Sequence, residues 1–144
     1  MFALFSVAAF VLLIDQLTKL IAIFWLKPQG SITVIPGIFH LNYVENTGIA
    51  FGFFQEHPEI LFYLIVVSVI GLLIGSRYLV RQRFSEKLAY GFILGGAIGN
   101  LVDRIRFQHV IDFLDFRVWP VFNLADSFIS IGVFLFIFFA LKRQ

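Results

Sequence analysis

The chain has 144 residues, of which 60% are hydrophobic and 14% are charged, whereas about a quarter of the residues of a soluble domain are charged. The composition therefore excludes an ordinary soluble domain and predicts one integral membrane domain over residues 1–144. A formal net charge of +2 gives no basis for nucleic-acid binding, and the lack of cysteine excludes a thiolate nucleophile. The scattered His40, His57 and His109 show no ligand spacing, so neither a metal nor a cofactor is expected.

The first apolar run predicts a transmembrane helix over residues 2–26, long enough to cross a hydrocarbon core of about 30 Å. It is too long for a signal peptide and has no basic start. Residues 27–59 differ, because 31–35 and 39–44 alternate β-branched and aromatic residues between turn-forming residues. This pattern predicts a small β element, and a Gly/Phe-rich stretch at 49–54 follows it. The β element is expected to rest on the membrane surface as an interfacial segment.

Three later apolar runs predict further helices over residues 60–80, 88–105 and 124–141. Four spans place both termini on one side of the membrane, together with a basic loop and the basic end of the chain. The positive-inside rule makes that side cytoplasmic. The fold class expected is mainly α and integral to the membrane, with four transmembrane helices and a small extracytoplasmic β element between the first two. The basic residues of the loop are Arg77, Arg81, Arg83 and Lys87, and those of the chain end are Lys142 and Arg143.

Polar residues gather at the outer ends of the predicted helices and in the outer segments. A charge at the centre of a bilayer costs about 2.5–3.5 kcal/mol even on an insertion scale, so these residues are expected to face a protein interior. Gly95 and Gly99 share one helix face at the spacing that lets helices approach closely. The candidate site residues are Asp15, Lys19, Asn46, Gly48, Asn100, Asp103, Arg104, Asp112, Asn123 and Asp126.

Most of these residues also have a structural interpretation. Asp15 and Lys19 have the spacing of an i,i+4 ion pair, and Asp103 and Arg104 form a possible pair at a helix end. Asp126 lies where it can cap the last helix. The two asparagines, Asn100 and Asn123, have the character of interhelical hydrogen-bonding groups.

Asp112 favours a functional interpretation, because apolar residues surround it in sequence and burial raises the pKa of a carboxyl group. Asp115, near Arg117, is expected to be solvated. Two carboxyl groups in a low-dielectric site tend to share one proton, which indicates an aspartyl hydrolase or a proton- or ion-handling membrane protein. The repeated Asn-Leu-x-Asp pattern favours Asp103 with Asp126, but the residues alone leave the pair open.

Five motifs together resemble one known family. They are Asp15-Gln-Leu-Thr-Lys19, Asn46-Thr-Gly-Ile-Ala-Phe51, Gly95-Gly-Ala-Ile-Gly-Asn-Leu-Val-Asp-Arg104, Val110-Ile-Asp-Phe113 and Phe122-Asn-Leu-Ala-Asp-Ser127. In this order they resemble the D-x-x-[ST]-K, N-x-G-x-A-F, G-G-x-x-G-N-x-x-D-R, V-x-D-F and F-N-x-A-D-S motifs of the bacterial lipoprotein signal peptidases. These enzymes form the signal peptidase II family of integral membrane aspartyl proteases. The resemblance covers essentially the whole chain.

The resemblance implies that Asp112 and Asp126 are the catalytic pair. It also implies that Asp103 supports the site through Arg104, and that Asp15 and Lys19 brace the first helix. The β element becomes a β cradle on the periplasmic side. The residues implied to line the site and bind substrate are Asn46, Gly48, Asn100, Arg104 and Asn123.

The implied activity is removal of the signal peptide from diacylglyceryl-modified prolipoproteins by cleavage before the lipidated cysteine, without a cofactor. The implied setting is the bacterial cytoplasmic (inner) membrane, with the active site near its outer face. Expected partners are the prolipoprotein and membrane lipids, and a monomer suffices. The alternative is a small ion- or proton-handling protein, although no continuous path of charges crosses the predicted bundle. A membrane anchor leaves the clustered outer acids unexplained.

Overall fold

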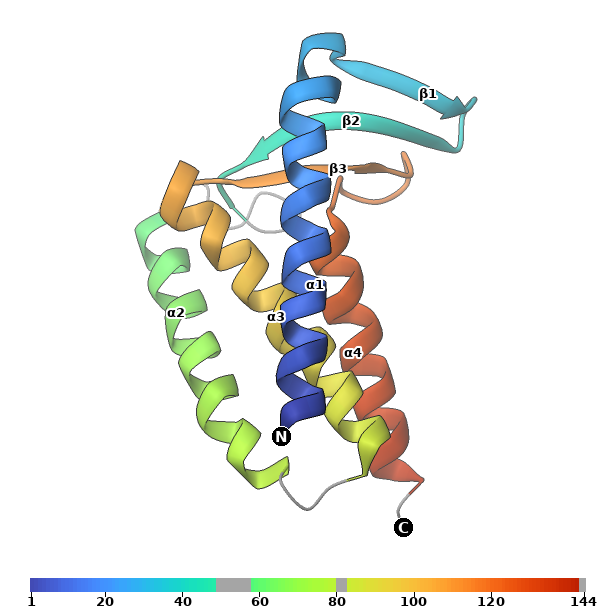
Figure 1. Cartoon of the computed structure of the whole chain (residues 1–144). Coiled ribbons are helices and arrows are strands. Elements are labelled where there is room, and N and C mark those ends of the chain that lie inside the picture. The colour runs from blue at the N-terminus through green and yellow to red at the C-terminus, as the bar shows by residue number, and fades with distance from the viewer. Residues whose placement is uncertain (49–57, 80–82, 143–144) are drawn as a thin grey trace.

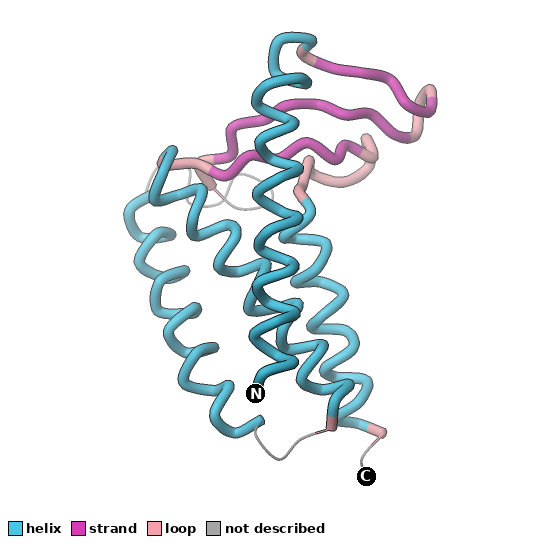
Figure 2. Tube along the Cα trace, viewed as in Figure 1, coloured by secondary structure: helices cyan, strands magenta, loops and turns pink. Residues whose placement is uncertain are grey.

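The computed structural model describes residues 1–48, 58–79 and 83–142. Its described elements are four α-helices and a small sheet packed at one end of them (Figures 1 and 2). This confirms the predicted mainly α membrane fold. The helices are α1 (Phe2–Ile21), α2 (Pro58–Gly75), α3 (Phe84–Phe107) and α4 (Leu124–Leu141), and the strands are β1 (Ser31–Ile35), β2 (Phe39–Asn46) and β3 (Val110–Asp115).

Three stretches of the described residues are long and apolar enough to cross a membrane: Phe2–Gln29, Glu59–Leu79 and Leu124–Leu141. The first joins α1 to a π-helical turn and a 3-10 turn that continue it to Gln29. α3 is less apolar than these three, but it packs against α1, α2 and α4, and Glu86, Asn100 and Asp103 are buried on it. Polar side chains are tolerated at membrane depth when protein covers them.

Glycine allows α3 to pack closely on two neighbours. A side chain at Gly95 would lie 2.6 Å from the carbonyl oxygen of Ala8 on α1, and one at Gly96 would lie 2.6 Å from that of Ala125 on α4. Gly99 likewise leaves room for the carboxylate of Asp15. The predicted close approach along the Gly95–Gly99 face is therefore present, and it brings α1 and α4 against the same part of α3.

The sheet is antiparallel, in the order β1-β2-β3. β3 lies between the predicted helices 88–105 and 124–141, where the sequence analysis predicts no strand. It pairs with β2, so that Asp112 lies opposite Val44. Ile111 and Phe113 of β3 pack with Ala22 and Leu26 of the π-helical turn that follows α1. Hydrogen-bonded pairing with β2 and the apolar packing of Ile111 and Phe113 together stabilise this short segment as a strand.

The prediction that Asp115 is solvated is wrong. Asp115 is only 5% exposed and lies in the strand opposite His40. It accepts a hydrogen bond from the backbone N–H of Arg117 at 2.8 Å, while the Arg117 Nε–H donates to His40 Nδ1 at 2.9 Å. The strand turns back immediately after Asp115, so the carboxylate satisfies the backbone of that turn instead of facing water.

Candidate active site

The start of α4 places Asp126 through a capping box. Asn123 is the N-cap residue, and its side-chain oxygen accepts the N–H of Asp126 at 2.9 Å. In return, Asp126 Oδ2 accepts the N–H of Asn123 at 3.3 Å. Both contacts satisfy backbone donors that a helix start leaves without partners. The carboxylate of Asp126 is therefore held by the same geometry that begins the helix.

Asn123 also contacts the second carboxyl group. Its Nδ2 donates to Asp112 Oδ1 at 2.7 Å and to Asn100 Oδ1 at 3.1 Å. Asn46, at the end of β2, donates to the other oxygen of Asp112 at 2.8 Å. One asparagine thus joins Asp112 on β3 to Asp126 on α4, directly after Phe122, which pairs with Leu114 of β3.

Asn100 on α3 completes the link. Its Nδ2 donates to Asp126 Oδ1 at 2.8 Å, and its Oδ1 accepts from both Asn123 and Lys19. Because an ammonium group only donates, the amide oxygen of Asn100 has to face Lys19. The amide nitrogen then has to face Asp126, so the orientation of this side chain follows from its partners.

A buried ion cluster lies behind Asn100, formed by Asp15, Lys19 and Asp103 and here called the Lys19 triad. Lys19 Nζ lies 2.9 Å from Asp15 Oδ2 and 2.8 Å from Asp103 Oδ2, and all three side chains are almost fully buried. The predicted i,i+4 pair is present. Asp103, however, forms its ion pair with Lys19 of α1, and none of the hydrogen bonds of Arg104 in the described structure goes to Asp103. The support of the site by Asp103 through Arg104, which the resemblance implies, stays a prediction.

Arg104 instead reaches the chain after β2. Its Nη2 donates to the carbonyl oxygen of Gly48 at 2.9 Å, and its Nη1 donates to that of Asn100 at 3.4 Å. Gly48 in turn donates its N–H to Asn46 Oδ1 at 3.0 Å. The Arg104 guanidinium, Gly48 and Asn46 therefore form one edge of the site. Ile49, Ala50 and Phe51 of the same motif, and the rest of the predicted stretch 49–54, lie outside the described residues.

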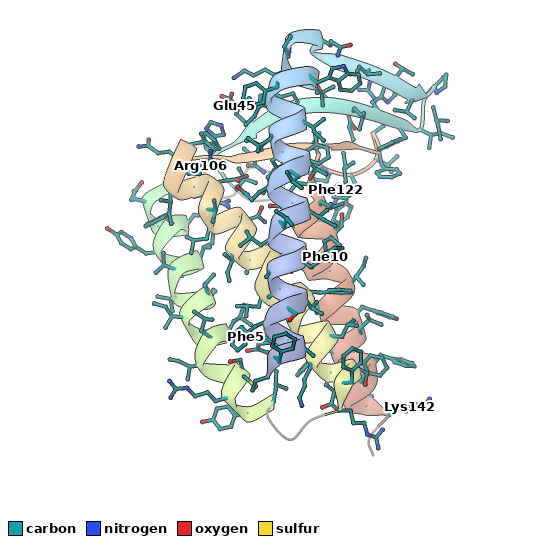
Figure 3. The ribbon with its side chains drawn as sticks, viewed as in Figure 1. Phe5, Phe10, Glu45, Arg106, Phe122 and Lys142 are labelled. Carbon is teal, nitrogen blue, oxygen red and sulfur yellow. The ribbon has the colours of Figure 1, made fainter. Side chains whose placement is uncertain are left out.

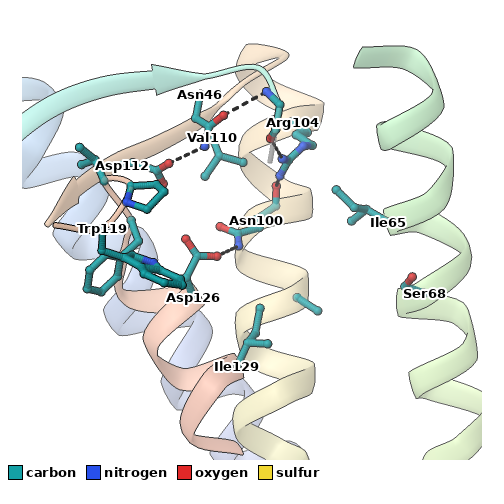
Figure 4. Close-up of a pocket in the computed structure, with 15 residues that line it drawn as sticks. Asn46, Ile65, Ser68, Asn100, Arg104, Val110, Asp112, Trp119, Asp126 and Ile129 are labelled. Carbon is teal, nitrogen blue, oxygen red and sulfur yellow. Dashed lines mark hydrogen bonds between the residues drawn. The ribbon is translucent and has the colours of Figure 1, made fainter. Parts of the chain in front are cut away.

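Asp112 and Asp126 both line a cavity of about 290 Å³ (Figure 4). Ile65 and Ser68 of α2 lie across from them, and apolar side chains form much of its wall. The cavity therefore offers an apolar cleft with two carboxyl groups on one side. The other lining residues are Asn46, Gly48, Ala97, Asn100, Arg104, Val110, Trp119, Pro120, Val121, Phe122 and Ile129.

The two carboxyl groups differ in environment. Burial, and then the nearby charge of Asp126, raise the pKa of Asp112 to about 7, while the amide donors of Asn46 and Asn123 partly oppose the shift. Asp112 is therefore suited to hold a proton near neutral pH. The described residues include no group of three or more histidine, aspartate or glutamate side chains placed to bind a metal.

The family model of signal peptidase (SPase) II matches residues 7–142. The chain belongs to the signal peptidase II family. This membership makes it a multi-pass membrane peptidase, as the motifs indicated, and favours the peptidase interpretation over an ion carrier.

Curated relatives of this signal peptidase II member agree. A lipoprotein signal peptidase of Halothermothrix orenii is 45% identical over 140 residues, covering 97% of this chain and 96% of the relative. One from Gloeothece citriformis is 49% identical over 124 residues, covering 84% and 78% respectively. A solved bacterial membrane enzyme is 30% identical with a TM-score of 0.85, covering 99% of this chain and 89% of that one.

The structure of this family member brings the ten predicted site residues together at the sheet end of the bundle, seven of them at the cavity or joined to its carboxyl groups and three in the Lys19 triad. Sequence reasoning missed Gln16, whose Nε2 donates to Asp103 Oδ1 at 2.9 Å and to the carbonyl oxygen of Gly99 at 3.3 Å. A polar residue next to Asp15 within an apolar helix was the available signal. It also missed Trp119, which lines the cavity from the β3–α4 connection.

Proposed function

We propose that this signal peptidase is an aspartyl endopeptidase that removes the signal peptide from diacylglyceryl-modified prolipoproteins, cutting before the lipidated cysteine. Its curated relatives carry the name lipoprotein signal peptidase. The observation that carries the aspartic mechanism is the pair Asp112 and Asp126, which line one cavity and are joined through Asn123. Neither the proposed activity nor its residues call for a metal or a cofactor.

In the proposed reaction, Asp126 is the general base and Asp112 the general acid. Asp126 takes a proton from a water molecule, which attacks the carbonyl carbon before the cysteine, while Asp112 protonates the carbonyl oxygen. When the tetrahedral intermediate collapses, Asp126 gives its proton to the leaving amine and Asp112 recovers one from the intermediate. The raised pKa of Asp112 supports this division, although the two groups titrate as one coupled pair.

The surrounding residues are proposed to hold the substrate. Asn46, Asn100 and Asn123 fix the two carboxyl groups, and Arg104 with Gly48 borders the cavity where a peptide backbone would lie. The apolar wall suits the signal helix and the acyl chains of the substrate and neighbouring lipids. A monomer supplies all of these groups.

The proposed location is the bacterial cytoplasmic (inner) membrane, with both termini in the cytoplasm and the site near the periplasmic face. Lys142 lies at the end of the bundle opposite the sheet, whereas Glu45 lies at the sheet end (Figure 3). Arg77 and Arg83 flank the connection between α2 and α3 at the Lys142 end. This distribution supports the orientation by the positive-inside rule.

Cleavage of a purified prolipoprotein in proteoliposomes tests the proposal. We expect a product that begins at the diacylglyceryl-cysteine, identified by mass spectrometry, and little cleavage of the same precursor without its lipid. Equal cleavage of both precursors would contradict the lipid requirement, and cleavage at another peptide bond would contradict the assigned specificity.

The pH profile tests the acid role of Asp112. Because the pKa of Asp112 is raised to about 7, the carboxyl group loses its proton above that pH and cannot protonate the substrate. We expect kcat/KM to fall by about tenfold per pH unit on the alkaline side, with half of the maximum near neutral pH. A profile that stays flat to pH 9 would contradict the assignment.

A further inference from the structure

The Lys19 triad has contacts that the proposed chemistry does not use. Beyond its ion pair with Lys19, each carboxylate accepts a backbone N–H from another element. Asp15 Oδ1 accepts the N–H of Ala125 at 3.0 Å, and Asp103 Oδ2 accepts that of Ile111 at 3.2 Å. In both cases, the residue that donates immediately precedes one of the two active-site aspartates in the chain.

We propose that the Lys19 triad is a positioning device, in which one ammonium group holds two carboxylates that set the backbone just before Asp112 and just before Asp126. The inference rests on the proposed function, because it concerns the placement of that catalytic pair. Asp15, Lys19 and Asp103 do not line the cavity. They therefore act through the elements that carry the catalytic groups and not on the substrate.

The triad has the connections that such a role needs. Lys19 is 2% exposed. The three N–H donors of its ammonium group are occupied by Asp15, Asp103 and Asn100, and these three partners fix the position of the group. The third contact is directed at the site as well, because Asn100 donates to Asp126. One side chain of α1 thus fixes β3 and the start of α4 by way of α3.

The α4 contact has an additional physical reason. Ala125 lies in the first turn of α4, where backbone N–H groups lack helical partners and the helix dipole favours a negative charge. Asn123 takes the N–H of Asp126, and Asp15 takes that of Ala125. A carboxylate from α1 therefore caps α4 from another helix, and its position determines where the first turn of α4 lies.

The hydrogen bonds predict a difference between two amide substitutions. At Asp15 both oxygens face donors, namely the N–H of Ala125 and the ammonium of Lys19, so an asparagine amide opposes a donor in either orientation. At Asp103 the second oxygen faces the amide of Gln16. An asparagine at this position can keep its oxygen towards Ile111 and Lys19 and loses only the contact with Gln16.

The test measures kcat and KM for a diacylglyceryl-peptide substrate in lipid–detergent micelles, per folded protein. We expect Asp15→Asn to lower kcat by about 100-fold, the effect of a displacement of about 1 Å in an active site, with KM changed less than twofold. Asp103→Asn is expected to retain at least about tenfold more activity than Asp103→Leu, because only asparagine keeps an acceptor for Ile111. Gly99→Ala, which presses on the carboxylate of Asp15 without removing a charge, should also lower kcat and serves if Asp15→Asn does not fold.

Glu45→Gln is the matched control. It removes the ion pair with Lys27 on the exposed side of β2, where the two groups lie 2.7 Å apart, and it should leave kcat unchanged. Wild-type kcat in folded Asp15→Asn or Gly99→Ala protein would overturn the inference, as would a raised KM with unchanged kcat. Asp112→Asn and Asp126→Asn run in the same assay separate the two proposals. If they are active, the proposed function fails, whereas if they are inactive and the triad variants keep full kcat, only this inference fails.

Discussion

Asp112→Asn and Asp126→Asn are each expected to abolish cleavage of a diacylglyceryl-prolipoprotein, lowering kcat by about 10³-fold or more. Acid–base catalysis by one positioned group contributes about 10²–10⁴-fold, and each substitution removes one of the two groups that must exchange protons with the substrate. The amide keeps the shape of the carboxyl group and can still accept a hydrogen bond, from Asn46 or Asn123 at position 112 and from Asn100 at position 126. The loss should therefore appear in kcat with KM little changed.

Asp115→Asn is the matched control for this experiment. Asp115 lies on the same strand as Asp112, is also buried, and contacts Arg117 instead of the cavity, so the variant should cleave at a near-normal rate. Near-normal cleavage by Asp112→Asn or Asp126→Asn would contradict the catalytic assignment. Full loss in folded Asp103→Asn protein would reopen the pair of Asp103 with Asp126.

Asp112 also gives the stability of the wild-type protein a pH dependence that the Asp112→Asn variant lacks. Because the folded-state pKa of Asp112 is raised from 3.8 to about 7, the stability from this carboxyl group is fully present below about pH 4 and is lost as the pH rises through about 7. An amide has no such dependence. The thermal midpoint of the variant should therefore match or exceed that of the wild type at pH 8, which separates a catalytic loss from an unfolded enzyme.

Lys19→Met should give the largest loss of stability, lowering the free energy of unfolding by about 3–5 kcal/mol. The substitution keeps a long unbranched side chain but leaves two buried carboxylates without their cation, and removing one member of a buried ion pair carries a cost of this size. Asp15 and Asp103 would then also repel each other. Denaturant titration in mixed micelles, followed by tryptophan fluorescence, measures the change.

Lys27→Met provides the comparison. Lys27 forms an ion pair of similar length with Glu45 at 2.7 Å, but both side chains are about half exposed. Exposed pairs contribute little to stability because water screens them, so the unfolding midpoint should hardly move. A Lys19→Met variant as stable as Lys27→Met would show that the triad is not an important source of stability.

The helices and the gathering of polar residues at one end of the bundle follow from the sequence because apolar runs and isolated charges are local signals. The identity of the pair does not. The Asn-Leu-x-Asp repeat favours Asp103, but in the fold Asp103 turns towards Lys19 on α1 and away from the cavity. Only a contact between distant segments distinguishes it from Asp112, and for that reason the family motifs were needed. The catalytic role of Asp112 and Asp126 stays a prediction.

β3 shows a second limit of sequence patterns. The alternation of apolar residues and aspartates in β3 is short and comes directly after a helix, so the sequence alone does not predict a strand there. The strand forms because β2 pairs with it. The same pairing buries Asp115, which we expected to be solvated because Arg117 is near it in the sequence. A strand at this position depends on a partner from between α1 and α2, and no local pattern contains that partner.

The shared role of Asn123 has a consequence for biosynthesis. Asn123 begins α4 and at the same time joins Asp126 to Asp112, so the site is complete only when α4 is in place. A nascent chain released after β3 would carry Asp112 but neither Asp126 nor the asparagine that orients both. During insertion, therefore, the proposed catalytic pair would form in one step with the docking of α4, and a chain without α4 would lack it.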